Sequence, residues 1–259
     1  MNQSVTVTGM ILSTTPIGDY DKRVVILTKE KGKISAFAKG ARRPSSTLMG
    51  KTNPFSFGEF VLYEGRSSYN IMQANISNYF MELGSDFEGA YYGFYFMEFA
   101  DYYTKEYNAE RQMLKLLYQT LRALSSEKIR RPLIRCIFEL KALVVNGEYP
   151  EVFECSNCGA KDRGVVFSSK NRGLICEECK ALAEDAIAVA GSTLYTLQYI
   201  VTTPIEKLYT FTVSEEVLEQ LQKILKQYLT MHVDKNFKTL EILETYFLDL
   251  KKANNNDII

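Results

Sequence analysis

The chain has 259 residues, of which 46% are hydrophobic and 24% are charged, and these values are typical of a globular protein with a well-formed core. Its 31 lysines and arginines balance 31 aspartates and glutamates, and a single histidine leaves little material for histidine-dependent acid–base catalysis. No apolar run approaches the length of a membrane span, and the first residues lack the basic and apolar parts of a secretory signal, so we expect a cytoplasmic protein with no membrane partner.

The net charge of zero hides a separation of charge along the chain. Residues 1–80 carry ten basic and five acidic side chains, a net charge of +5, so the remainder carries −5. Within residues 20–51, nine basic side chains stand against two acidic ones. Such an excess of positive charge in one segment is typical of a segment that binds a polyanion.

Residues 1–80 show the alternating and β-branched runs of a small β domain. We expect strands near residues 5–11, 23–28, 33–38, 57–64 and 69–76, with the second and third forming a hairpin. Five short strands in about eighty residues fit a closed barrel better than a sandwich. The sequence therefore predicts an OB-fold over residues 1–80.

Residues 81–259 change to a helical period. Nine aromatic residues between Tyr91 and Tyr107 surround one helix and predict that it is buried on most sides. Further helices are expected along the leucines of 114–124, from Pro132 to about Gly147, and after the N-cap residue Ser214. A last helix is marked by four apolar positions, namely Leu240, Leu243, Phe247 and Leu250. The predicted class is α+β, with an OB-fold domain at 1–80 and a helical domain at 81–259.

Four of the five cysteines form two C-x2-C pairs, Cys155 with Cys158 and Cys176 with Cys179, separated by seventeen residues. This spacing is typical of a four-thiolate zinc site, because each pair lets two sulfur atoms converge on one tetrahedral ion. Two disulfides are disfavoured without a secretory signal, and a redox dithiol would need a βαβ context. We predict one structural Zn²⁺ in a ribbon-like module over 153–181, with no open position for catalysis; the fifth cysteine, Cys136, is expected in the core.

The segment 39–44, Lys-Gly-Ala-Arg-Arg-Pro, places three cations at the junction of a strand and a loop. Arginine suits phosphate because its planar guanidinium donates two hydrogen bonds at once. The candidate nucleic-acid contacts are Lys22, Arg23, Lys31, Lys33, Lys39, Arg42, Arg43 and Lys51. A solvated charged loop remains an alternative. Phe37 could stack on a base, but we expect it in the barrel core.

In several of these segments the sequence resembles the RecO family of bacterial recombination mediators. The matching segments are Gly-Met-Ile-Leu at 9–12, Asp-Lys-Arg-Val at 21–24, the segment 39–44, Asn-Pro-Phe at 53–55 and the paired cysteines. The resemblance implies an OB-fold, a helical domain, a zinc element and association with the nucleoid. It also implies binding of single- and double-stranded DNA, annealing of complementary strands, and loading of RecA onto DNA coated by the single-stranded-DNA-binding protein SSB, with RecR as a partner.

The resemblance further implies a site for the acidic C-terminal tail of SSB. Basic residues beside the 114–124 leucines are the candidates for it, namely Arg111, Lys115, Arg122, Arg130 and Arg131. Solvated helix faces are the alternative interpretation of these residues.

The sequence contains little that indicates an enzyme. It has no Gly-x4-Gly-Lys-Ser/Thr loop for ATP, and its basic segment has no acidic cluster for catalytic magnesium, so we expect neither catalysis nor a small-molecule substrate. The competing interpretation is a zinc-ribbon and OB-fold nucleic-acid-binding factor of transcription or translation.

Overall fold

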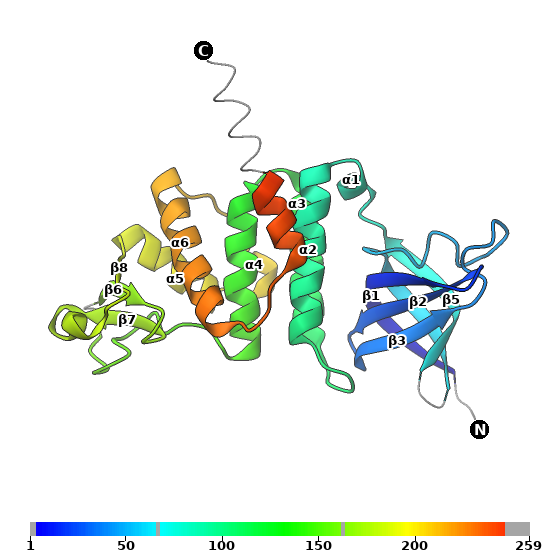
Figure 1. Cartoon of the computed structure of the whole chain (residues 1–259), viewed down its shortest axis with the longest axis horizontal. Coiled ribbons are helices and arrows are strands. Elements are labelled where there is room, and N and C mark those ends of the chain that lie inside the picture. Colours follow the sequence, from blue (N-terminus) through cyan, green and yellow to red (C-terminus); the bar gives the residue numbers. More distant parts are fainter. Residues whose placement is uncertain (1–3, 66–67, 162–163, 247–259) are drawn as a thin grey trace, which may run out of the picture. The chain divides into compact units, whose positions relative to one another are not determined.

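The computed structural model of the chain describes residues 4–65, 68–161 and 164–246 (Figure 1). It divides into two compact units. The first unit contains Met1–Ser125 together with Phe237–Ile259, and the second contains Ser126–Asn236. Arg66, which contributes to the charge count of residues 1–80, lies outside the described residues.

The first unit begins with a closed β-barrel. Its strands are β1 Ser4–Ile17, β2 Asp21–Thr28, β3 Gly32–Ala38, β4 Phe57–Glu64 and β5 Tyr69–Asn78. They close in the order β1-β2-β3-β5-β4, and all neighbours are antiparallel except β3 and β5, which pair in parallel. The long strand β1 closes the barrel because it pairs with β4 through its first half and with β2 through its second. The predicted OB-fold and the predicted β2–β3 hairpin are confirmed.

Side chains of β3 alternate strictly between the interior and the outer face of the barrel. Ile34, Ala36 and Ala38 are buried in the barrel core, whereas Ser35 and Phe37 are half-buried on the outer face. The expectation that Phe37 lies in the barrel core is therefore wrong. Because strand side chains alternate with a period of two, the small Ala36 and Ala38 on either side of it fill the narrow interior and leave its ring outside.

Three helices follow the barrel, namely α1 Met81–Gly84, α2 Phe87–Tyr103 and α3 Arg111–Ser126. Helix α2 is buried on most sides, as its ring of aromatic residues predicts. It ends at Tyr103, because Thr104 is extended, with φ −90° and ψ 146°. The prediction that this helix reaches Tyr107 is thus wrong, since Tyr107 lies in the loop that follows it.

The β2–β3 turn packs closely against the loop between α2 and α3. The backbone N–H of Lys33 donates to the carbonyl oxygen of Lys105 over 3.1 Å, and Gly32 forms a β-bridge with Glu106. A Cβ atom at Gly32 would lie only 2.2 Å from the carbonyl oxygen of Asn108, and its φ of +67° is left-handed. Both observations require glycine at this contact.

The chain returns to the first unit at Phe237. The ring of Phe237 stacks on Phe99 with centroids 5.1 Å apart and meets Tyr95 edge-on at 5.5 Å. The hydroxyl of Thr239 donates to the carboxylate of Glu98 over 2.6 Å. Residues 238–246 are helical, in agreement with the predicted last helix, whereas its predicted positions Phe247 and Leu250 and the polar tail lie outside the described residues.

The second unit combines helices with a small sheet. Its elements are α4 Arg131–Asn146, β6 Gly164–Ser168, β7 Gly173–Cys176, the 3-10 helix η1 Glu177–Leu182, β8 Ile187–Ala188, α5 Gly191–Thr202, the 3-10 helix η2 Ile205–Lys207 and α6 Glu215–His232. Pro132 lies in the first turn of α4 and Gly147 ends it, and Ser214 caps α6, all as predicted. Strands β6 and β7 form a hairpin within the expected ribbon-like module, and β8 adds a third strand to it.

A buried lysine joins α4 to the C-terminal end of α5. The ammonium group of Lys141 donates to the carbonyl oxygens of Ile200, Val201 and Thr203 over 3.2, 2.8 and 2.7 Å. Burial lowers its pKa from the usual value. The last carbonyls of a helix have no partner within the helix, and Lys141 therefore supplies one. Cys136 is buried in the same helix, as predicted.

Among the helices that the structure describes, none is both long enough and apolar enough to cross a membrane.

Candidate nucleic-acid interface and cysteine cluster

A group of cations lies at the end of the barrel where β2 begins and β3 ends. Lys22 and Arg23 are the second and third residues of β2, and Lys22 is paired with Ala38, the last residue of β3. The segment after β3 adds three further cations. We call this set the basic cluster: Lys22, Arg23, Lys39, Arg42 and Arg43.

Contacts between two segments fix the arginines of the basic cluster. The backbone N–H of Arg42 donates to the carbonyl oxygen of Tyr20 over 2.9 Å, and its guanidinium donates to the carbonyl oxygen of Gly18 over 3.1 Å. The guanidinium of Arg43 lies over the ring of Tyr20, 4.8 Å from the ring centroid. This cation–π contact and the two hydrogen bonds hold both arginines beside the β1–β2 turn.

Within the described residues, no ion pair neutralises the charge of the basic cluster. Among the residues that the structure describes, no carboxylate lies within ion-pair distance of its five cations. The nearby carboxylate of Asp21 accepts the backbone N–H of Gly40 over 2.7 Å. Burial and the neighbouring charge of Arg42 lower the pKa of Lys22. The basic cluster therefore presents an unbalanced positive field to the solvent.

The other three predicted nucleic-acid contacts lie elsewhere on the barrel. Lys31 and Lys33 are at the opposite end of the β2–β3 hairpin, about 20 Å away at the usual rise per strand residue. The ammonium group of Lys31 lies 5.6 Å from the ring centroid of Tyr69, and that of Lys33 pairs with the carboxylate of Asp101 over 3.2 Å. Lys51 lines a separate shallow pocket. The structure thus brings five of the eight predicted cations together.

Sequence reasoning missed Tyr20, which orients Arg43. This tyrosine is 50% exposed in the turn between β1 and β2. The available signal was an aromatic residue in a short polar turn, between Asp19 and Asp21. Loops at this position of an OB-fold commonly contact oligonucleotides, which is a reason to examine such a residue.

The four predicted metal-binding cysteines lie together in the second unit. Cys155 and Cys158 come from the loop before β6, Cys176 ends β7, and Cys179 lies in η1. Their four sulfur atoms all lie within 4.8 Å of one another. Gly159 follows the first pair with a left-handed φ of +71°, which allows the tight turn there.

The geometry of this cysteine cluster fits one tetrahedral metal ion. The sulfur atoms of Cys158 and Cys176 are 3.7 Å apart. Four sulfur ligands at a zinc–sulfur distance of about 2.3 Å would lie about 3.8 Å apart, whereas a disulfide needs about 2.05 Å. Burial opposes ionisation of Cys155, but backbone N–H groups of Cys176, Cys158 and Asn157 outweigh it and lower the pKa of its thiol to about 6. A low pKa favours the thiolate that binds metal.

The backbone N–H of Ala160 lowers the pKa of the Cys158 thiol, but hydrogen bonds with the other three cysteines outweigh it and raise this pKa to about 12, and the pKa of Cys179 is raised as well. The support for a metal site is therefore the convergence of the four sulfur atoms.

Two family models match the chain in succession. The model described as "Recombination protein O N terminal" matches residues 1–80, and the model described as "Recombination protein O C terminal" matches residues 84–241. The chain belongs to the RecO family. This membership associates the chain with DNA repair and recombination, and it confirms the resemblance noted in the sequence.

Curated RecO proteins are similar over nearly their whole length. The "DNA repair protein RecO" of Alkaliphilus metalliredigens is 35% identical over 236 residues, which cover 90% of this chain and 96% of the relative. The proteins of the same name from Acetivibrio thermocellus and Clostridium novyi are 31% and 30% identical, and the matches cover 92% and 96% of this chain and 95% of each relative.

The residues expected at an SSB site of this RecO chain fall into two groups. Arg111, Lys115 and Arg122 lie on α3, whereas Arg130 and Arg131 precede and begin α4 in the second unit. The guanidinium of Arg130 is bidentate to the carboxylate of Glu215. The leucines between them on α3 are all buried in the core: Leu114, Leu117, Leu121 and Leu124.

Proposed function

We propose that this RecO chain is a non-enzymatic recombination mediator whose basic cluster binds the phosphates of single- and double-stranded DNA. In this proposal residues 1–80 are the DNA-binding domain and residues 81–259 are the helical domain. The single observation that carries the proposal is the basic cluster itself, five cations without an ion pair in the described structure at one end of an OB barrel. Membership of a DNA repair family supports DNA as the polyanion.

The arrangement of Arg42 and Arg43 suits phosphate recognition. Both guanidinium groups are exposed, and both are held by contacts that leave donors available. A guanidinium held in place before binding loses less side-chain entropy when it meets a phosphate. Lys31 and Lys51 extend the positive surface in this proposal, while Lys33 contributes least because Asp101 already neutralises it.

The finer activities follow from the family and are part of the same proposal. The chain anneals complementary strands and, with RecR, helps to load RecA onto SSB-coated single strands in the nucleoid. The tail of SSB, being acidic, would be attracted to the arginines of α3 and to Arg130 and Arg131. Support for this last assignment is charge alone, since the leucines of α3 are buried.

We further propose that the cysteine cluster holds one structural Zn²⁺. The thiolates of Cys155, Cys158, Cys176 and Cys179 would be its four ligands, and such a closed site has no position for a catalytic water. When bound, the ion would join the loop before β6 to the end of β7 and to η1.

The test is a salt series of DNA binding with the double variant Arg42→Ala/Arg43→Ala. Each phosphate contact to a single strand contributes about −0.7 to the slope of log affinity against log salt concentration, so losing two contacts should reduce the slope by about 1.4. Fluorescence anisotropy of a labelled oligonucleotide measures this slope, and annealing of SSB-coated strands should slow in parallel.

The matched control is Lys207→Ala/Lys223→Ala, which removes the same charge from exposed positions of the second unit. The control should leave the slope unchanged. An Arg42→Ala/Arg43→Ala protein with the slope of the wild type would refute the assignment of the basic cluster.

A further inference from the structure

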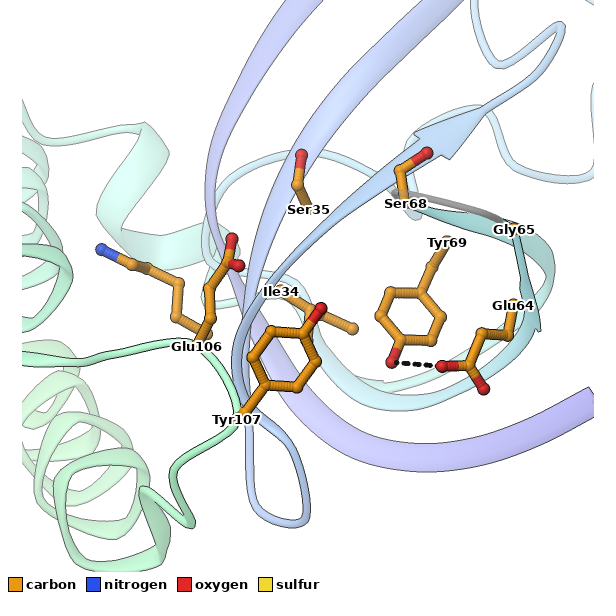
Figure 2. A pocket seen from close by; sticks show the side chains of 9 residues that line it. Ile34, Ser35, Glu64, Gly65, Ser68, Tyr69, Glu106 and Tyr107 are labelled. Atoms are coloured by element: carbon orange, nitrogen blue, oxygen red, sulfur yellow. Dashed lines mark hydrogen bonds between the residues drawn. The ribbon is translucent and has the colours of Figure 1, made fainter.

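A small pocket lies on the barrel beside the loop between α2 and α3. Its volume is about 60 Å³, and residues of β3, of β5 and of this loop line it. Figure 2 shows the rings of Tyr69 and Tyr107 bordering the pocket, with Ile34 between them. The hydroxyl of Tyr69 donates to the carboxylate of Glu64 over 3.4 Å, so this ring is fixed in place.

Tyr107 is held in an exposed position by a well-braced loop. Its side chain is 82% exposed, and no described residue stacks on its ring or hydrogen-bonds to its hydroxyl. Its φ of 60° is left-handed, a conformation that costs a tyrosine free energy. The loop is nevertheless fixed, because Glu110 accepts hydrogen bonds from the side chain of Asn108 over 2.9 Å and from the backbone of Lys105 over 3.3 Å. A strained, exposed aromatic residue on a fixed loop is typical of a binding site.

The lining of the pocket favours a flat, uncharged group over a phosphate. The carboxylates of Glu64 and Glu106 both line it and would repel an anion. Lys33 lines it too, but its charge is paired with the carboxylate of Asp101 over 3.2 Å. The volume of about 60 Å³ is well below the ~150 Å³ of a cavity that holds a benzene ring, so the pocket can hold the edge of a ring but not a whole nucleobase. The exposed ring of Tyr107 would then provide the stacking face outside the pocket.

The pocket is continuous with the basic cluster along the outer face of the barrel. Ser35 lines the pocket, and its hydroxyl accepts a hydrogen bond from the guanidinium of Arg23 over 2.8 Å. Four residues of rise along β3, about 13 Å, separate Ser35 from Lys39 at the other end of this face. The half-buried ring of Phe37 lies between them on the same face.

We propose that Tyr107 and the adjoining pocket form a stacking site for an unpaired nucleobase of a single strand whose phosphates lie on the basic cluster. This inference rests on the proposed DNA-binding function and adds to it a reason to prefer single strands. The base faces of a single strand are free to stack on an aromatic ring, whereas those of a duplex are covered by neighbouring base pairs.

The test compares Tyr107→Ala with the wild type on a single-stranded oligonucleotide and on a blunt-ended duplex over a salt series. Stacking on an aromatic residue is sequence-tolerant and does not involve phosphates, so Tyr107→Ala should weaken single-strand binding about five-fold or more with an unchanged salt slope. Duplex affinity should not change, and Tyr107→Phe should bind like the wild type. Alanine keeps a Cβ atom, so the backbone strain at this position stays the same.

The matched control is Tyr195→Ala, a 68% exposed tyrosine of the second unit, which should leave both affinities unchanged. Equal single-strand affinity of Tyr107→Ala and the wild type would overturn the stacking site while leaving the proposed function intact. If Tyr107→Ala lost the same affinity for the single strand as for the duplex, the stacking site would be overturned as well. A wild type without salt-dependent DNA binding would instead overturn the proposed function, and the stacking site with it.

A second measurement detects binding at the stacking site directly, by fluorescence at position 107. The chain has no tryptophan, so Tyr107→Trp introduces a single indole whose fluorescence reports on this position alone. The single-stranded oligonucleotide should quench it, and the duplex should not. Quenching by an arginine-rich peptide but not by the oligonucleotide would identify a protein side chain as the occupant and would contradict the proposal.

Discussion

The barrel and the cysteine ribbon depend on different sources of stability. Among the residues that the structure describes, the barrel core contains fourteen buried residues, and none of these is a cysteine. The described part of the ribbon has a cluster of six buried residues around the cysteines, and three of these are the metal-binding candidates Cys155, Cys176 and Cys179. Phe167 and Leu174 of the ribbon are also buried but lie outside this cluster. Apolar burial therefore suffices for the barrel, whereas so small a core needs a further constraint such as a metal ion.

This comparison predicts that removing the proposed zinc ion has the largest effect and that the effect is confined to the second unit. Structural zinc contributes about 10–16 kcal/mol of apparent binding free energy in small domains, more than such a core supplies. A strong chelator, or the variant Cys155→Ser, should unfold the ribbon and leave the barrel folded. Hydrogen exchange resolved along the chain, with zinc content measured on the same sample, checks this outcome.

The matched control for the ribbon is Cys136→Ala, which removes a buried thiol outside the cysteine cluster. Its zinc content should equal that of the wild type. If residues 153–181 stay protected from exchange after complete loss of metal, the contrast between barrel and ribbon fails.

A smaller effect is expected from Lys141→Met, which tests whether the two units unfold separately. This variant leaves buried carbonyls at the end of α5 without their donor, at a cost of about 2–3 kcal/mol. Urea denaturation should show an earlier transition for the second unit and an unshifted one for the barrel. Lys223→Met, at an exposed position of α6, is the control and should change neither transition. A common shift of both transitions would show that the units unfold as one.

The smallest effect is expected from Lys33→Met, which sharpens the contrast between the two ends of the β2–β3 hairpin. Its ion pair with Asp101 is partly exposed, and such pairs contribute less than about 1 kcal/mol. The salt slope of DNA binding should not change, because the charge of Lys33 is already neutralised. The salt series described above checks this. If Lys33→Met reduced the salt slope of DNA binding as much as Arg42→Ala alone does, Lys33 would belong to the phosphate contacts.

Local patterns predicted most of the architecture and the cysteine cluster. The spacing of Cys155, Cys158, Cys176 and Cys179 already constrains where sulfur atoms can meet, and the ends of α4 follow from Pro132 and Gly147. The strands of the barrel follow from alternation, and the hairpin register separates Lys22 from Lys33.

Features that depend on packing between distant segments were not predictable in the same way. Closure of the sheet decides which side of the barrel Phe37 faces. The hydrophobic character of Phe37 alone favoured the barrel core, whereas its ring lies on the outer face. Helix α2 ends before Tyr107 without a glycine or proline to mark the end, where the following loop meets the β2–β3 turn. The contact of Arg43 with Tyr20 joins residues from separate segments and has no sequence pattern.

The return of the chain to the first unit at Phe237 has a consequence for biosynthesis. Phe237 and Thr239 complete the contacts of α2 through Phe99, Tyr95 and Glu98, yet they are made after the entire second unit. The barrel can close on the ribosome as soon as β5 has emerged, but the aromatic face of α2 stays uncovered while residues 126–236 are synthesised. During translation this face is therefore exposed apolar surface of the kind that chaperones protect from aggregation.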